Sequence, residues 1–235
     1  MTLGLNDYNN ITVLTGAGIS VASGLPTYRG PRGLWNDPEK IALATAEAMA
    51  ADPNRCWAMF SRLRELAAAA EPNAAHHALA HMERHGKNIT IITQNVDGLH
   101  QRAGSKNVVE LHGSIHRTRC CKCDLEPFED SSPPADEAPP CPQCDAPLRA
   151  AVVLFGEVVG GEEHLAKRAI RDCDLFLAIG TSGTVSPASS FVRSAEYAGA
   201  HTVYINVEPM EPANSMFKQS ILGPAEDILP RIAGL

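Results

Sequence analysis

Four cysteines stand in two Cys-x-x-Cys pairs, Cys120 with Cys123 and Cys141 with Cys144, and 17 residues separate the pairs. Two hooks at this spacing can bring four thiolates to the corners of a tetrahedron, which is how proteins hold structural Zn²⁺. Because four protein thiolates leave no open position for water, we expect one zinc ion that stabilises the fold and takes no part in catalysis. Cys121 lies inside the first pair and is not an expected ligand.

Three histidines form a second group with metal-ligand spacing. His77, His81 and His85 are four residues apart, so they share one face of a predicted helix. A zinc protease would carry a glutamate directly after the first histidine, and this stretch lacks that HExxH pattern. We therefore predict a solvated helix face here rather than a second metal site.

A polar cluster that could do chemistry follows two predicted strands. Gln94, Asn95 and Asp97 come after one apolar run, and His112 follows the next. Because the carboxyl ends of parallel strands meet at one edge of a sheet, these amide, carboxylate and imidazole groups should converge there. An imidazole can take up a proton near neutral pH, so this setting predicts that His112 is a general base.

Other strand ends carry residue types that bind nucleotides. Residues 16–20 read Gly-Ala-Gly-Ile-Ser, a turn whose glycines could let backbone N–H groups approach a phosphate. Val21 replaces the third glycine of the usual dinucleotide motif, so a turn without a ligand is an equal alternative. Residues 180–182 read Gly-Thr-Ser after another strand, and Asn206 and Glu208 end a third. A carboxylate at such a place can accept a hydrogen bond from ribose.

Six short apolar runs alternate with stretches that have the pattern of helices. The runs span residues 11–15, 89–93, 108–111, 152–155, 175–179 and 202–207. Each is nearly continuously apolar, which is typical of a parallel sheet covered on both faces. Helices are expected from the Asn73 cap to Gly86, over residues 162–171 and over residues 187–198. This alternation predicts an α/β fold with a doubly wound, Rossmann-like parallel sheet.

Two stretches interrupt the alternation. Residues 31–72 are alanine-rich and helical in pattern, and residues 116–150 hold five of the seven cysteines. We expect residues 1–30, 73–115 and 151–235 to form the Rossmann-like domain. The helical module 31–72 and the zinc-binding module 116–150, a zinc ribbon, should together form a smaller inserted domain.

Composition and charge exclude several classes of protein. The chain of 235 residues is 44% hydrophobic and has a net charge of −7, so a nucleic-acid-binding surface is not expected. No apolar run is long enough for a membrane span, and the first residues do not resemble a secretion signal. The seven clustered cysteines indicate metal ligation in a reducing compartment, so we expect a cytoplasmic protein, and a monomer.

Taken in order, these motifs resemble one known family, the sirtuins. GAGIS at residues 16–20 is followed by SGLPTYR at 23–29, QNVDGLH at 94–100, ELHGS at 110–114, the two Cys-x-x-Cys pairs, VVLFGE at 152–157, GTS at 180–182 and INVE at 205–208. The resemblance covers essentially the whole chain. It implies an NAD-dependent deacylase that acts on acyl-lysine in proteins or peptides and releases nicotinamide and O-acyl-ADP-ribose.

The resemblance also implies roles for the matched residues. His112 would activate a ribose hydroxyl, with Asn95 and Asp97 lining the nicotinamide pocket. The implied NAD contacts are Gly16, Ala17, Gly18, Ser20, Pro26, Tyr28, Arg29, Gln94, Asn95, Asp97, Gly180, Thr181, Ser182, Asn206, Glu208 and Ala225. The implied contacts with the substrate peptide, by strand addition, are Val153, Phe155, Gly156 and Glu157.

One part of the chain departs from the branch of the family that it most resembles. That branch includes desuccinylases, which hold acidic acyl chains with a Tyr-x-x-Arg pair. Phe60 and Leu63 stand at those positions here, so a hydroxyl and a cation are lost. A buried carboxylate without its partner costs on the order of several kcal/mol. We therefore predict acetyl or apolar acyl groups as substrates, for which the small Ala44 leaves room. A register slip of one residue would let Arg62 or Arg64 restore acid binding.

Three other functions stay open at this stage. The first is a protein mono-ADP-ribosyltransferase that uses the same NAD site, and the second is a deacylase for succinyl or malonyl groups. The third is a binding protein that senses NAD or uses its zinc ribbon without catalysis. The intact cluster around His112 favours deacylation over the first and the third, and Phe60 and Leu63 argue against the second.

Overall fold

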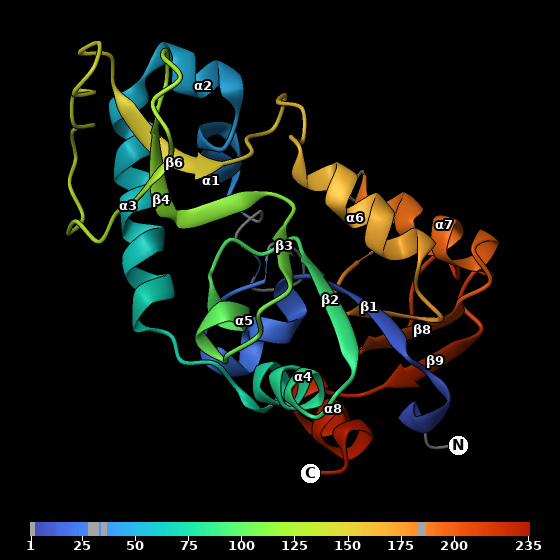
Figure 1. Ribbon diagram of the computed structural model, residues 1–235. Helices are drawn as coiled ribbons and strands as arrows, with labels where there is room; N and C mark the ends of the chain where they lie inside the picture. Colours follow the sequence, from blue (N-terminus) through green and yellow to red (C-terminus); the bar gives the residue numbers. More distant parts are fainter. Residues whose placement is uncertain (1–2, 28–32, 34–36, 183–186) are drawn as a thin grey trace.

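The central sheet of the protein has six parallel strands in the order β3-β2-β1-β7-β8-β9 (Figure 1). The computed structural model describes residues 3–27, 33, 37–182 and 187–235. The strands are β1 (Asn10–Thr15), β2 (Asn88–Thr93), β3 (Val108–Glu110), β7 (Leu175–Ile179), β8 (His201–Asn206) and β9 (Gln219–Leu222). Two halves that wind outwards from β1 and β7 give the order of a doubly wound, Rossmann-like sheet. The predicted fold class is confirmed.

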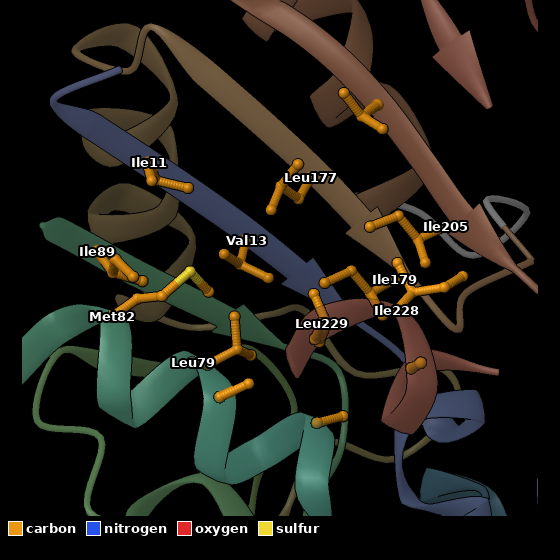
Figure 2. Packing of buried hydrophobic residues seen from close by; sticks show 14 of the residues in the cluster. Ile11, Val13, Leu79, Met82, Ile89, Leu177, Ile179, Ile205, Ile228 and Leu229 are labelled. Carbon is orange, nitrogen blue, oxygen red and sulfur yellow. The ribbon is translucent and has the colours of Figure 1, made fainter. Parts of the chain in front are cut away.

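Helices cover both faces of this sheet, which explains why its strands are apolar throughout. Helices α4 (Ala74–Arg84) and α8 (Ala225–Ala233) pack on one face, and α6 (Glu162–Arg171) and α7 (Phe191–Tyr197) pack on the other. Successive side chains of a strand point to opposite faces. In β7, Leu177 therefore packs with α4 and α8, whereas Phe176 packs with α6 and α7. Figure 2 shows the first of these two cores, where Leu79 of α4 and Leu229 of α8 lie over Val13 and Leu177.

A second sheet of three strands is antiparallel and follows the order β5-β4-β6. Its strands are β4 (Gly113–Cys120), β5 (Phe128–Glu129) and β6 (Leu148–Val152). The predicted strand over residues 152–155 was therefore wrong, since β6 ends at Val152 and pairs with β4 outside the central sheet. Val152 is buried against α3, so an apolar run arises here as it would in a parallel strand. The sixth central strand is β9, whose residues are only partly buried and carry no such run.

Three helices lie beside this second sheet, and their ends are capped by side chains. They are α1 (Pro38–Leu43), α2 (Ala46–Ala51) and α3 (Pro53–Ala69). Asp37, Thr45 and Asp52 accept hydrogen bonds from backbone N–H groups in the first turns of α1, α2 and α3. Figure 1 shows α3 running alongside β4 and β6. The proposed domain boundaries around this part of the chain stay a prediction.

The remaining helices are short. Among the described residues they are α5 (Leu99–Arg102) and three 3₁₀ helices, Leu5–Asp7, Ala17–Ser23 and Ala188–Ser190. Across the described segments, no helix combines the length and apolar character that crossing a bilayer requires.

Candidate active site

A cavity of about 1140 Å³ follows the carboxyl ends of β1, β2, β7 and β8 and continues between α3 and β6. Ligands bind at this edge in doubly wound sheets. The expected site residues that line it are Gly16, Ala17, Gly18, Ala44, Phe60, Leu63, Gln94, Asn95, His112, Val153, Phe155, Gly156, Glu157, Gly180, Thr181, Ser182, Asn206, Glu208 and Ala225. Residues far apart in the sequence thus share one cavity.

A smaller cavity of about 60 Å³ adjoins the first, because Leu63, Asn95 and Ala17 line both. The expected site residues Ser20, Pro26 and Asp97 line only this smaller cavity. Two further expected contacts, Tyr28 and Arg29, lie outside the described residues.

The glycines after β1 bring two strand ends into close contact. The N–H of Gly16 donates to the oxygen of Ile179 and that of Gly18 to the oxygen of Gly180, at 3.0 and 2.9 Å. A Cβ on Gly18 would lie 2.6 Å from the Cα of Gly180, and Gly180 itself has φ of +60°. These glycines therefore let the ends of β1 and β7 cross in contact, rather than offering their N–H groups to a phosphate. Ala17, between them, lines both cavities.

A hydrogen-bond network joins Asn95 and Asp97 to the turn after β1. The amide nitrogen of Asn95 donates to the oxygen of Gly16 and to Oγ of Ser20, at 3.2 and 3.3 Å. The Ser20 hydroxyl in turn donates to Asp97 at 2.8 Å. Burial raises the pKa of Asp97, and the hydrogen bonds from Ser20 and the Leu99 N–H oppose this shift. The Oδ1 atom of Asn95 is buried and accepts no hydrogen bond from the described residues.

The half-buried His112 is held by the backbone of the neighbouring strand end. Its Nδ1 lies 3.0 Å from the oxygen of Gln94. Since a carbonyl oxygen can only accept, Nδ1 carries the proton, and Nε2 is the nitrogen that can take up another. Burial lowers the pKa of His112 below its usual range, and the bond to Gln94 works against this shift. The neutral imidazole that a general base needs is therefore the favoured form near pH 7.

Two buried histidines behind this site were missed by sequence reasoning. The rings of His76 and His100 meet edge to face, with centroids 4.9 Å apart. His100 Nε2 lies 3.0 Å from the Thr15 hydroxyl, which donates to Thr93, and Thr93 accepts the N–H of Asn95. Burial lowers the pKa of His76 to about 4 and that of His100 well below its usual range. No motif in the sequence distinguished His76 from its exposed neighbours on the same helix.

The part of the cavity between α3 and β6 has an apolar wall. Besides Ala44, Phe60 and Leu63, sequence reasoning missed further members of this wall: Met59, Val96, Ile115, Val152 and Leu154. Met59 lies four residues before Leu63 on α3, so helical periodicity could have found it. The others come from strands and loops that only the fold brings to this place.

The arginines that flank Phe60 and Leu63 do not serve the cavity. Arg64 is buried and donates from Nε to the oxygen of Ile115 and from Nη1 to Asp130, at 2.8 and 2.6 Å. Arg62 pairs with Asp136 at the surface at 2.8 Å. A register slip therefore does not bring either cation to the acyl side.

Lys40 of α1 lines this same cavity and was not predicted to do so. Among the described lining residues it is the one lysine or arginine. Its Nζ lies 3.3 Å from Asp37, and both side chains are nearly half exposed. A pair this exposed is weak, so Asp37 holds the Lys40 ammonium only loosely.

The loop after β6 forms hydrogen bonds within the chain, in addition to the contacts with a substrate peptide that were predicted for it. Both oxygens of Glu157 accept hydrogen bonds from Arg149, at 2.6 and 3.0 Å. The N–H of Phe155 donates to the oxygen of Ala44 and its oxygen accepts the N–H of Ala46, both at 2.9 Å. The Glu157 carboxylate and these backbone groups of Phe155 are thus already engaged within the chain.

The four expected zinc ligands lie together at the far end of the second sheet. The Sγ atoms of Cys120, Cys123, Cys141 and Cys144 are all within 4.8 Å of one another, and two pairs are 3.6 Å apart. This is much longer than a disulfide of about 2 Å and close to the edge of a Zn–thiolate tetrahedron, about 3.8 Å. The residues fit a structural zinc ion.

The histidines at four-residue spacing form no such cluster. The rings of His81 and His85 stack with centroids 3.9 Å apart, and His85 Nδ1 lies 2.9 Å from the oxygen of His81. Among the described residues, the four cysteines are the one group of three or more potential ligands with metal-binding geometry.

Comparison with known proteins agrees with the geometry of the site. A profile that describes the Sir2 family matches residues 16–187, more than half of the chain. The chain belongs to the Sir2 family, the sirtuins. This sirtuin is 47% identical over 224 residues to a protein of Pyrobaculum aerophilum named NAD-dependent protein deacylase 2, which covers 94% of this chain and 88% of the relative.

Solved sirtuin structures have the same fold. A Sir2 homologue in complex with NAD has a TM-score of 0.90 at 38% identity, covering 97% of this chain and 89% of that one. A Sir2 protein in complex with a p53 peptide and NAD⁺ has a TM-score of 0.82 at 28% identity, covering 98% and 94%.

Proposed function

We propose that this sirtuin, an NAD-dependent protein deacylase, removes acetyl and apolar acyl groups from lysine, with His112 as general base. The observation that carries the acyl preference is the apolar wall of the cavity between α3 and β6. Phe60 and Leu63 line that wall, and Arg62 and Arg64, the nearby cations on α3, are paired elsewhere. A carboxylate placed against Leu63 would lose water without gaining a fixed partner.

The residues of the strand-end edge fit NAD⁺. The lining of the cavity includes Glu208, Ala225, Thr181 and Asn95, so the nucleotide and nicotinamide ends would lie at different strand ends. The orphaned Oδ1 of Asn95 is an acceptor to which a carboxamide N–H could donate. When bound, NAD⁺ supplies the ADP-ribose group that accepts the acyl chain and the nicotinamide that leaves.

His112 accepts the proton that this transfer must move. Because Nδ1–H is tied to Gln94, Nε2 of the neutral ring can accept a proton from a ribose hydroxyl. Asn95 and Asp97 keep their orientation through Ser20 and bind the nicotinamide end. The Gln94 amide donates to the Thr181 hydroxyl at 2.9 Å, which links the ribose side to β7. The products are free lysine, nicotinamide and O-acyl-ADP-ribose.

The partners and the compartment follow from the same chemistry. The sirtuin solved with a p53 peptide supports a peptide or protein as the substrate. Four thiolates that bind zinc require a reducing environment, which supports a cytoplasmic location. We propose a monomer that binds no nucleic acid, in keeping with the net charge of −7.

A panel of acyl-lysine peptides tests this function. Acetyl, butyryl, octanoyl, succinyl and malonyl peptides are incubated with and without NAD⁺. The deacylated peptide, nicotinamide and O-acyl-ADP-ribose are then measured by mass spectrometry. We expect turnover of the acetyl and apolar peptides with NAD⁺ only. Succinyl turnover that equals acetyl turnover would overturn the acyl preference. Labelled NAD⁺ that leaves its label on the protein substrate would instead indicate ADP-ribosyl transfer.

A further inference from the structure

The loop after β6 is held by a buried arginine. The Arg149 side chain is 7% exposed. Its Nη1 and Nη2 donate to the two oxygens of Glu157, and Nη2 also donates to the oxygen of Val152 at 2.6 Å. Planar, two-pronged pairs of this kind are geometrically specific. A buried guanidinium that lost its carboxylate would be an unpaired charge, so the Glu157 carboxylate is committed to Arg149.

Three consecutive N–H groups of this loop donate to three different parts of the site. The Val153 N–H donates to the oxygen of His112 at 2.9 Å. The Leu154 N–H donates to Oε2 of Glu157 at 2.9 Å. The Phe155 N–H donates to the oxygen of Ala44 at 2.9 Å, and all three residues line the cavity. Glu157 therefore binds the middle of a segment whose ends contact the base and the acyl wall.

We propose that the Arg149–Glu157 pair is a positioning device for acyl-lysine, which sets the width of the cavity between His112 and Ala44. This inference rests on the proposed function. The pair does not contact His112, but it binds the backbone of the wall residues Val152 and Leu154, and through residues 152–155 it acts on the site. The carboxylate of the glutamate in the VVLFGE motif thus binds within the chain, whereas a contact of this residue with the substrate peptide was predicted.

The chain offers a control for the loss of a carboxylate that faces a buried arginine. Asp130 accepts hydrogen bonds from Arg64 and from Thr118, each at 2.6 Å, and its side chain is 7% exposed within the pair. It lines neither cavity. Asp130→Asn and Glu157→Gln both replace a carboxylate that faces an arginine with an amide of the same shape. Both should lower Tm, but only Glu157→Gln should release the loop.

The test compares steady-state kinetics of the two variants well below the Tm of both. We expect Glu157→Gln to raise KM for an acetyl-lysine peptide about tenfold, with KM for NAD⁺ changed less than about twofold. Asp130→Asn should change the KM for the peptide and the KM for NAD⁺ to the same small extent. The KM of Arg149→Lys for the peptide should lie between those of the wild type and of Arg149→Met, because an ammonium keeps the charge but loses the two-pronged geometry of the guanidinium.

A second readout does not depend on turnover. Binding of a fluorescent acetyl-lysine peptide, followed by anisotropy, should weaken about tenfold in Glu157→Gln and not in Asp130→Asn. Equal effects of the two variants on peptide affinity, or an unchanged affinity in Glu157→Gln, would overturn the positioning role. Wild-type protein that binds the peptide and does not deacylate it would contradict the proposed function alone.

Discussion

The Nδ1 atom of His112 lies 3.0 Å from the backbone oxygen of Gln94, 18 residues earlier at the end of the neighbouring strand. A side-chain partner could change its protonation, whereas a carbonyl oxygen is an acceptor at every pH. The bond therefore fixes the imidazole tautomer wherever the ring is neutral. It places Nε2, and not Nδ1, in the role of the base.

The activity of the enzyme should depend on the neutral form of His112. Burial lowers the pKa of this ring below 6.5, so the neutral base predominates at pH 7 and is lost as the pH falls through the lowered value. We expect kcat/KM for an acetyl peptide to be flat from about pH 7 to 8 and to fall at lower pH. His112→Ala should reduce kcat by about 10²- to 10⁴-fold. A variant that keeps the wild-type rate of O-acyl-ADP-ribose formation would exclude this role.

Acyl preference should be reversible at two positions of the wall. The double variant Phe60→Tyr, Leu63→Arg adds a hydroxyl and a cation where both are absent. We expect the ratio of succinyl to acetyl kcat/KM to rise about tenfold or more, since a partly buried carboxylate then has a partner. Phe60→Tyr alone is the control and should change the ratio little. Lys40→Met tests whether the exposed cation of α1 contributes, and we expect the wild-type ratio from it.

Zinc should stabilise the fold without touching the chemistry. Cys144→Ser removes one of the four clustered thiolates, whereas Cys121→Ser changes an exposed cysteine outside the cluster. Metal analysis should find one zinc per chain in the wild type and in Cys121→Ser, and much less in Cys144→Ser. A loss of a few kcal/mol in the free energy of unfolding of Cys144→Ser should lower the Tm of a chain of this size by about 10 °C. A Cys144→Ser protein with full zinc content would show that the ligand set is wrong.

The buried His76 should make stability fall in mild acid. Its folded pKa is about 4, below the 6.5 of the unfolded chain, so the unfolded state binds more protons between these values. Stability is then complete above about pH 7 and is lost as the pH falls towards 4. His76 alone should cost roughly 2 kcal/mol between pH 7.5 and 5.

Urea unfolding at both pH values measures this cost. His76→Gln removes the titrating ring, so its free energy of unfolding should change less with pH than that of the wild type. His77→Gln alters the exposed neighbour on the same helix but keeps the buried ring, so it should lose more stability on acidification than His76→Gln. If His76→Gln and the wild type lose equal stability on acidification, the buried ring does not carry the effect.

Much of this molecule is determined by its sequence alone. Continuous apolar runs are typical of parallel strands covered on both faces, and the runs at β1, β2, β7 and β8 were found within one residue, whereas the run at residues 152–155 was misassigned. Local spacing was also sufficient for the zinc cluster, since each Cys-x-x-Cys hook is a turn of the chain. Its four sulfur atoms lie together as the spacing predicts.

The tertiary structure alone decided the contacts between segments that are distant in sequence. In the folded chain Glu157 pairs with Arg149, and Arg64 pairs with Asp130 instead of lining the cavity. His76 is buried beside His100. Residue types state what a side chain can do, but its partners depend on which face of each element is covered. That is settled by packing against helices and strands elsewhere in the chain, where burial makes an unpaired charge too costly to leave.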